Sequence, residues 1–124
     1  TRSWRRFLLK PDAVQLAELD GQIAGAAVLL FRTGSRKARL YSIATAEFSR
    51  GRGVARALME RCERVAKSRG CEAISLEVHE NNRNAIALYN SAGFRVTGTK
   101  QGFYSDGANA IVMGKRLATS GPGQ

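Results

Sequence analysis

The chain over 13–46 has the apolar and polar patterning of short strands separated by turns, with alternation clearest over 13–18. A segment over 13–18 runs into Asp20-Gly21, a pair that favours a hairpin turn, and a long apolar strand is expected over 22–32. A second turn at 33–36 leads to a third strand over 38–46. The pattern therefore predicts three successive antiparallel strands.

The period changes to that of a helix after residue 53. Apolar residues recur three or four positions apart from Val54 to Val65, which predicts an amphipathic helix that stops at Gly70. The strand expected over 73–78 runs parallel to the third strand if the crossover is right-handed. Beyond it we expect a helix over 83–92, capped by Asn81 or Asn82, and two strands over 94–98 and 108–115.

This order, β-β-β-α-β-α-β-β, predicts an α/β (α+β) domain with a mixed sheet and helices packed on it. A chain of 124 residues with 44% apolar content fits one domain, which we place at 1–117 and follow with a polar, mobile tail at 118–124. No apolar run approaches the roughly 18 residues that cross a bilayer, and no secretory signal stands at the start, so a cytoplasmic location is expected.

Charge and cysteine content narrow the function classes. The net charge of +10 favours anionic partners, such as nucleic acid, a ribosomal surface or a polyphosphate cofactor. The basic residues are scattered, which favours a solvated surface over a dedicated nucleic-acid groove. Cys62, Cys71 and the single histidine, His79, are too few for a disulfide framework or a four-ligand metal site.

The segment Arg50 to Ala55 has the composition of an anion-binding loop. Its glycines let backbone amides approach an anion, and the helix start that follows presents unpaired N–H groups. A P-loop needs Lys-Ser or Lys-Thr after the second glycine, where this chain has Val54-Ala55, and a dinucleotide fingerprint needs a small residue where Arg56 stands. Taken alone, the segment also fits an ordinary turn.

Two motifs resemble the signatures of the GNAT superfamily of N-acetyltransferases. Arg50, Gly53 and Ala55 match its pyrophosphate motif, and Leu76 to Phe94, with Asn82, an Ala-x-x-Leu-Tyr run and Gly-Phe, is similar to its second signature. The resemblance covers Gln15 to about Leu117. The branch it resembles most is the RimI-type ribosomal-protein N-terminal alanine acetyltransferase.

The resemblance implies a GNAT fold, whose mostly antiparallel sheet has a central parallel pair splayed around acetyl-CoA, with no metal. The backbone of the strand before the loop would hold the pantetheine arm, the loop amides the pyrophosphate, and Asn82 the cofactor from the second helix, with added charge from Arg50 or Arg52. The implied cofactor-binding residues are Ile43, Ala44, Thr45, Arg50, Gly51, Arg52, Gly53, Val54, Ala55, Arg56 and Asn82.

Acetyl transfer requires a neutral amine and a stabilised or protonated thiolate leaving group. Glu77, the carboxylate inside the strand over 73–78, is the expected base, with a pKa raised by partial burial, and Tyr89 is the expected acid. Both positions match the base and acid of the RimI-type branch. His79 is the competing base. A half-solvated Glu77 and a core Tyr89 are the structural alternatives.

The chain departs from the family pattern in three places. Only residues 1–12 precede the first hairpin, and the chain starts without Met, so we expect a shortened N-terminal region. The aromatic pair of the last loop is Phe103-Tyr104, and Asn109 replaces an expected acidic residue. The expected acceptor is a protein or peptide α-amine. A small-molecule amine, a non-catalytic acyl-CoA-binding regulatory module and a basic nucleic-acid-binding domain remain competing functions.

Overall fold

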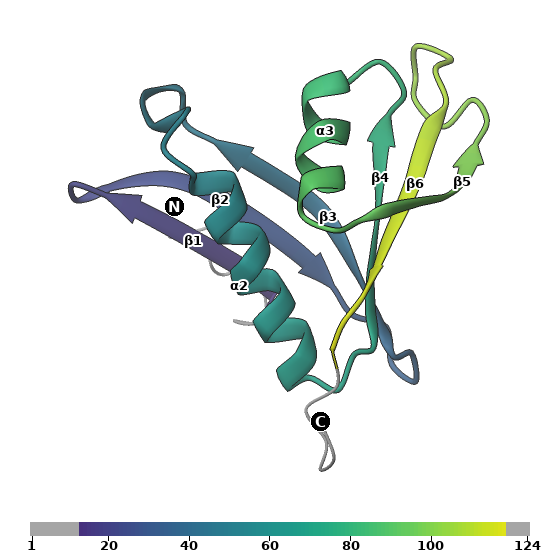
Figure 1. Ribbon diagram of the computed structural model, residues 1–124, viewed down its shortest axis with the longest axis horizontal. Helices are drawn as coiled ribbons and strands as arrows, with labels where there is room; N and C mark the ends of the chain where they lie inside the picture. The colour runs from purple at the N-terminus through teal and green to yellow at the C-terminus, as the bar shows by residue number, and fades with distance from the viewer. Residues whose placement is uncertain (1–12, 119–124) are drawn as a thin grey trace.

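The computed structural model describes residues 13–118, which form a six-stranded mixed sheet covered by helices (Figure 1). The strand order across the sheet is β1-β2-β3-β4-β6-β5. The elements, in chain order, are β1 (Val14–Leu19), β2 (Gln22–Leu30), β3 (Lys37–Thr45), the 3₁₀ helix η2 (Glu47–Ser49), α2 (Val54–Ser68), β4 (Ala73–His79), α3 (Arg83–Ser91), β5 (Arg95–Lys100) and β6 (Ala110–Arg116). The predicted order of strands and α-helices is confirmed; η2 was not predicted. Of the tail expected at 118–124, residues 119–124 lie outside the described residues.

Strands β1, β2 and β3 form the predicted antiparallel meander. Asp20 and Gly21, between β1 and β2, have φ angles of 53° and 79°. Positive φ at both central residues gives the type I′ turn that matches the twist of paired strands. This local preference fixes which residues of β1 and β2 face each other.

Helix α2 packs on this meander because one of its faces is apolar. Leu58, Met59 and Cys62 are almost completely buried in the hydrophobic core. Gly25 of β2 allows the close approach: a Cβ there would lie 2.9 Å from the carbonyl oxygen of Ala44 and 3.0 Å from side-chain atoms of Leu58 and of Val54. The start of α2 is thereby held against the centre of the sheet.

The sheet opens between its two parallel strands. β3 and β4 pair only from Lys37 with Ala73 to Leu40 with Leu76. Beyond this point they run apart toward their carboxyl ends, and α3 lies in the space between them (Figure 1). The edge of β4 that faces away from β3 pairs with β6, and β5 lies beyond β6. After α3 the chain therefore forms the outer strand β5 first and then turns back to form β6 between β4 and β5.

The two α-helices of the described chain lie on the same face of the sheet. Arg56 of α2 donates a hydrogen bond to Ser91 of α3 at 2.7 Å, and Lys115 of β6 bonds both Glu63 of α2 and the carbonyl of Ala92. None of the helices among the described residues is long and apolar enough to cross a membrane.

Candidate active site

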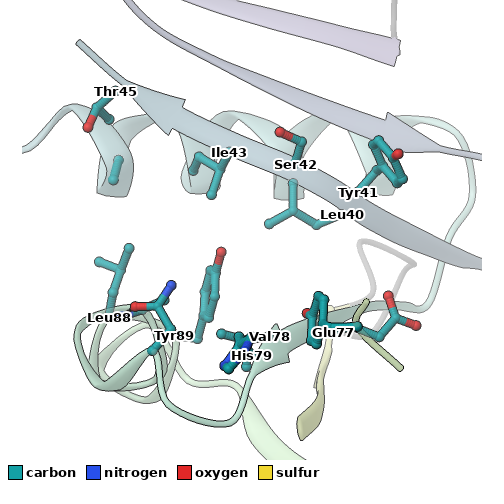
Figure 2. A pocket seen from close by; sticks show the side chains of 14 residues that line it. Leu40, Tyr41, Ser42, Ile43, Thr45, Glu77, Val78, His79, Leu88 and Tyr89 are labelled. Carbon is teal, nitrogen blue, oxygen red and sulfur yellow. Dashed lines mark hydrogen bonds between the residues drawn. The ribbon is translucent and has the colours of Figure 1, made fainter. Parts of the chain in front are cut away.

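A cleft of about 440 Å³ opens where β3 and β4 separate (Figure 2). Side chains from β3, β4, α2, α3 and the β5–β6 loop line it. They are Leu40, Tyr41, Ser42, Ile43, Thr45, Ala55, Glu77, Val78, His79, Asn82, Ala85, Leu88, Tyr89 and Tyr104. The cleft thus lies at the carboxyl ends of parallel strands, where open α/β sheets place their ligands.

A second cavity of about 270 Å³ surrounds the glycine-rich loop. It is lined by Arg50, Gly51, Gly53 and other residues of the loop and of the α2 start. Thr45, Ala55 and Leu88 line both this cavity and the cleft, so the two adjoin. The resulting site is elongated, with the predicted anion-binding loop at one end and Glu77 at the other.

The loop has the backbone geometry of an anion site. Gly51 and Gly53 have φ angles of 79° and 77°, in the left-handed region that favours glycine. Gly53 is the N-cap of α2 and provides no side-chain cap, and the first helical bond runs from the Ala57 N–H to the Gly53 carbonyl. The amides of the first helical turn therefore point out of the helix start, where the helix dipole also favours negative charge.

Two amides of the segment are already engaged, and the first is the N–H of Arg50, which donates to the carbonyl of Glu47 at 3.2 Å. The N–H of Arg52 donates to the carbonyl of Ser49 at 3.2 Å, which closes the turn between η2 and α2. Ser49 is itself buried, and its hydroxyl donates to the carbonyls of Ala24 and Ala46. Arg52 therefore helps to shape the loop with its backbone, and the remaining amides of the segment are the candidates for anion contact.

Of the three predicted β3 contacts, two present their backbone to the opening. The N–H of Ala46 donates to the Ala24 carbonyl of β2 at 2.7 Å, and alternate residues of a strand point the same way. The backbone groups of Ala44 accordingly face β2, whereas those of Ile43 and Thr45 face the cleft. The backbone contact expected between Ala44 and the cofactor is not supported, because strand alternation directs the backbone groups of Ala44 toward β2 and away from the cleft.

Asn82 is the N-cap of α3, which resolves the choice between Asn81 and Asn82. Its side-chain oxygen accepts a hydrogen bond from the Ala85 N–H at 3.2 Å, while its side chain also lines the cleft. Since the oxygen serves the cap, the amide NH₂ of Asn82 is the group suited to donate to a ligand.

Glu77 lies in the cleft, but its pKa moves in the opposite direction to the expectation. Its side chain is only 9% exposed, and burial alone would raise the pKa. Lys100 donates to one carboxylate oxygen at 2.8 Å and Arg39 to the other at 2.9 Å. These bonds and charges outweigh burial and hold the pKa of Glu77 below its ordinary value, so the predicted rise is wrong.

Tyr89 projects from α3 into the opening between the splayed strands (Figure 2). It is 7% exposed and packs against Phe94, with ring centroids 5.8 Å apart. Burial, with a smaller contribution from Tyr104, raises the pKa of Tyr89. The phenol therefore stays protonated at neutral pH, as a hydrogen-bond donor must. In Figure 2 the Glu77 carboxylate lies well away from the Tyr89 hydroxyl.

His79 also lines the cleft, but both of its ring nitrogens have partners. Nε2 lies 2.9 Å from a carboxylate oxygen of Asp106, and Nδ1 accepts a hydrogen bond from the Asn81 N–H. This arrangement assigns the Nε2-protonated tautomer, because Nδ1 acts as the acceptor. Its ring stacks on Tyr104 at a centroid distance of 4.9 Å. The geometry favours a structural role for His79 over that of the base.

The structure adds residues that the motifs did not indicate. Tyr41 lines the cleft together with Tyr104 of the aromatic pair already noted in the last loop, and Arg39 and Lys100 bind Glu77. Arg39 is a charged residue within a largely apolar strand, which was the one signal available in the sequence. Asn109, noted as a departure, accepts a hydrogen bond from the Gly102 N–H, and its own N–H donates to Glu80. It positions the β5–β6 loop. No cluster of three or more potential metal ligands occurs among residues 13–118.

The model of the acetyltransferase (GNAT) family matches residues 2–94. The chain belongs to this family. Its sequence is 34% identical over 113 residues to an acetyltransferase from Pectobacterium atrosepticum, an alignment that covers 91% of this chain and 71% of the relative. It is 37% identical over 83 residues to an N-alpha-acetyltransferase from Saccharolobus solfataricus, covering 66% of this chain and 50% of the relative. The chain thus spans half of the archaeal relative's length.

Solved structures of GNAT enzymes share the fold. Ard1 from Thermoplasma volcanium superposes with a TM-score of 0.83 at 28% identity, covering 95% of this chain and 80% of that one. The ribosomal-protein-S18-alanine N-acetyltransferase from Escherichia coli superposes with a TM-score of 0.78 at 27% identity, covering 97% of this chain and 80% of that one. Nourseothricin acetyltransferase superposes with a TM-score of 0.75 at 34% identity, covering 80% of this chain and 61% of that one. The GNAT domain is therefore an acetyl-CoA-dependent acetyltransferase, and its elongated site fits a ligand with one anionic end.

Proposed function

We propose that this GNAT domain transfers the acetyl group of acetyl-CoA to the α-amine of a protein or peptide. The observation that carries the proposal is the opening between β3 and β4, which leads from the uncapped start of α2 to Tyr89 and Glu77. The similarity to an archaeal N-alpha-acetyltransferase and to the S18-alanine enzyme supports a peptide acceptor of the RimI type.

In this proposal the amides of Gly51 and of Gly53 to Arg56 bind the pyrophosphate, assisted by the charge of Arg50 or Arg52. The backbone of Ile43 and Thr45 would bind the pantetheine arm, with the Asn82 amide as a further donor. Amides held rigidly at a helix start need little reorganisation to receive an anion. The bound thioester supplies an activated acetyl carbonyl and a thiolate leaving group.

The chain's own residues would handle two protons. The amine nitrogen bonds to the acetyl carbon as the carbon–sulfur bond breaks; Glu77, directly or through water, accepts the amine proton, and the Tyr89 hydroxyl donates its proton to sulfur. The pairs with Arg39 and Lys100 keep Glu77 ionised, so it is ready to accept a proton at neutral pH but is a weak base. Nearby cations compensate by lowering the pKa of the incoming amine.

Tyr89→Phe tests the acid assignment. We expect kcat to fall about 100-fold, within the usual contribution of a general acid. Acetyl-CoA affinity, measured by calorimetry, should stay nearly unchanged, because the ring and its packing remain. Tyr104→Phe is the matched variant, since Tyr104 is the other phenol in the cleft with a raised pKa. Full activity in Tyr89→Phe with a large loss in Tyr104→Phe would move the acid role to Tyr104.

A small-molecule amine is the second candidate acceptor, favoured by the 34% identity to nourseothricin acetyltransferase. Thiol release from acetyl-CoA, followed with N-terminal peptides and with polyamines, separates the two. Tight acetyl-CoA binding without thiol release for any acceptor would indicate a non-catalytic acyl-CoA-binding module instead.

A further inference from the structure

Two cations share a single carboxylate at the Glu77 end of the cleft. Arg39 from β3 and Lys100 from β5 share one carboxylate, that of Glu77, so the three groups together have a net charge of +1. Both cations are accessible, with side chains 41% and 49% exposed, whereas Glu77 is 9% exposed. An incoming ligand therefore meets the cations before it meets the carboxylate.

Each cation also lies against an exposed aromatic ring. The Arg39 guanidinium is 5.9 Å from the centre of the Tyr41 ring, and the Lys100 ammonium is 5.3 Å from that of Phe103. Tyr41 and Phe103 are 63% and 43% exposed. These rings restrict where the two cations can point and offer apolar contact beside them.

Arg39 extends the positive surface beyond the cleft. It lines a further cavity of about 720 Å³, together with Arg32, Lys37 and Ser75. The described residues that line this cavity include no Asp or Glu. Arg50 and Arg56 line the cavity at the opposite end of the site, so Arg39 and Lys100 are separate from the proposed phosphate loop.

We propose that the acetyl acceptor is an acidic peptide, with a carboxylate within its first residues that binds Arg39 and Lys100 while its amine enters the cleft. This inference rests on the proposed acetyl-transfer function and specifies its substrate class. Arg39 has five N–H donors and Lys100 has three, and Glu77 accepts on only two oxygens, so both cations retain donors for a second carboxylate. The same charges repel a polycationic acceptor.

The test compares acceptors that differ only in charge. Amidated tetrapeptides with Asp at the first or second residue are assayed for thiol release against their Asn and Lys counterparts. Free aspartate and its amide form a separate arm, which distinguishes a free amino acid from a peptide. We expect kcat/KM to favour the Asp peptides over the Asn peptides roughly tenfold, the scale of two half-exposed ion pairs, and to decline with added salt. Lys peptides should be poorer still.

Arg39→Gln combined with Lys100→Gln should remove most of this preference. Arg36→Gln is the matched control, because Arg36 precedes the same strand and pairs with Glu72, away from the cleft. The ratio between Asp and Asn peptides is the readout, since a merely structural loss would lower both rates together. Equal rates for Asp and Asn peptides with wild-type protein, or a preference for Lys peptides or free aspartate, would overturn the proposal.

Peptide binding to the CoA-saturated protein, measured by calorimetry, keeps the two proposals separable. If no acceptor is turned over, the proposed function fails. Recognition of an acidic peptide by Arg39 and Lys100 is then still supported if the Asp peptide binds more tightly than the Asn peptide and the double variant abolishes the difference. It fails if the two peptides bind equally.

Discussion

Substitution of Gly25 by alanine perturbs the contact that holds α2 against the sheet. The added Cβ would lie 2.9 Å from the Ala44 carbonyl oxygen and 3.0 Å from atoms of both Leu58 and Val54. The two side chains can yield, but the carbonyl belongs to the paired β3 backbone and cannot move without disturbing the β2–β3 ladder. Overpacking of this kind typically costs about 1–3 kcal/mol.

Gly98→Ala is the matched control because Gly98 is also a strand glycine outside the left-handed region, and no atom lies within 4 Å of its added Cβ. Loss of unfolded-chain entropy alone should stabilise such a variant by about 0.4–1 kcal/mol. The same entropic gain applies to Gly25→Ala and cancels in the comparison, so the difference between the variants is the cost of the clash, about 2 kcal/mol. Urea denaturation gives this difference directly, and thermal unfolding should separate the two midpoints by roughly 5–10 °C.

The substitution should also weaken acetyl-CoA binding, because Val54 begins α2 at the proposed phosphate loop. Calorimetry on Gly25→Ala and Gly98→Ala would show the loss in the first only. If Gly25→Ala matched Gly98→Ala in both stability and affinity, the close packing of α2 on β2 would be refuted.

Three further predictions concern the glycine-rich loop, the stability of the fold at acidic pH and the two cysteine thiols. Gly53→Trp should abolish acetyl-CoA binding in calorimetry, whereas Gly34→Trp should not, although both glycines have φ near 80° and open space for a Cβ. The pKa of Glu77 is lower in the folded protein than in the unfolded chain, so its ionised form stabilises the fold above about pH 4.3 and this contribution is lost as pH falls through the folded pKa. Glu77→Gln should therefore show a shallower decline of urea stability below about pH 4.5 than wild type; an identical decline would contradict the ion pairs. Burial, followed by the charge of Glu63, raises the pKa of Cys62 to about 11, which leaves about 0.1% thiolate at pH 8. A thiol reagent should label the partly exposed Cys71 first, and Cys71→Ser should react only after unfolding; rapid labelling of native Cys71→Ser would show that Cys62 is accessible.

The order of elements was predictable from the sequence because its causes are local. The Asp20-Gly21 pair specifies a type I′ turn through its own backbone preferences, and the helical period from Val54 to Val65 reflects burial of one face. The glycine-rich loop before α2 was likewise predictable from the sequence, since its conformation depends on residues a few positions apart. The sequence predicted Asn81 or Asn82 as the N-cap of α3, and the structure identifies it as Asn82.

The position of β6 and the environment of Glu77 were decided by tertiary structure. Strand pairing across the sheet depends on which edges are left open, and β6 took the edge of β4 that chain order would assign to β5. Arg39 lies 38 residues before Glu77 and Lys100 23 residues after it, yet both bind its carboxylate. The sequence by itself placed a carboxylate in the correct strand. Its lowered pKa, the contact of His79 Nε2 with Asp106 and the meeting of Arg39 and Lys100 at one carboxylate come from long-range contacts that no local pattern encodes.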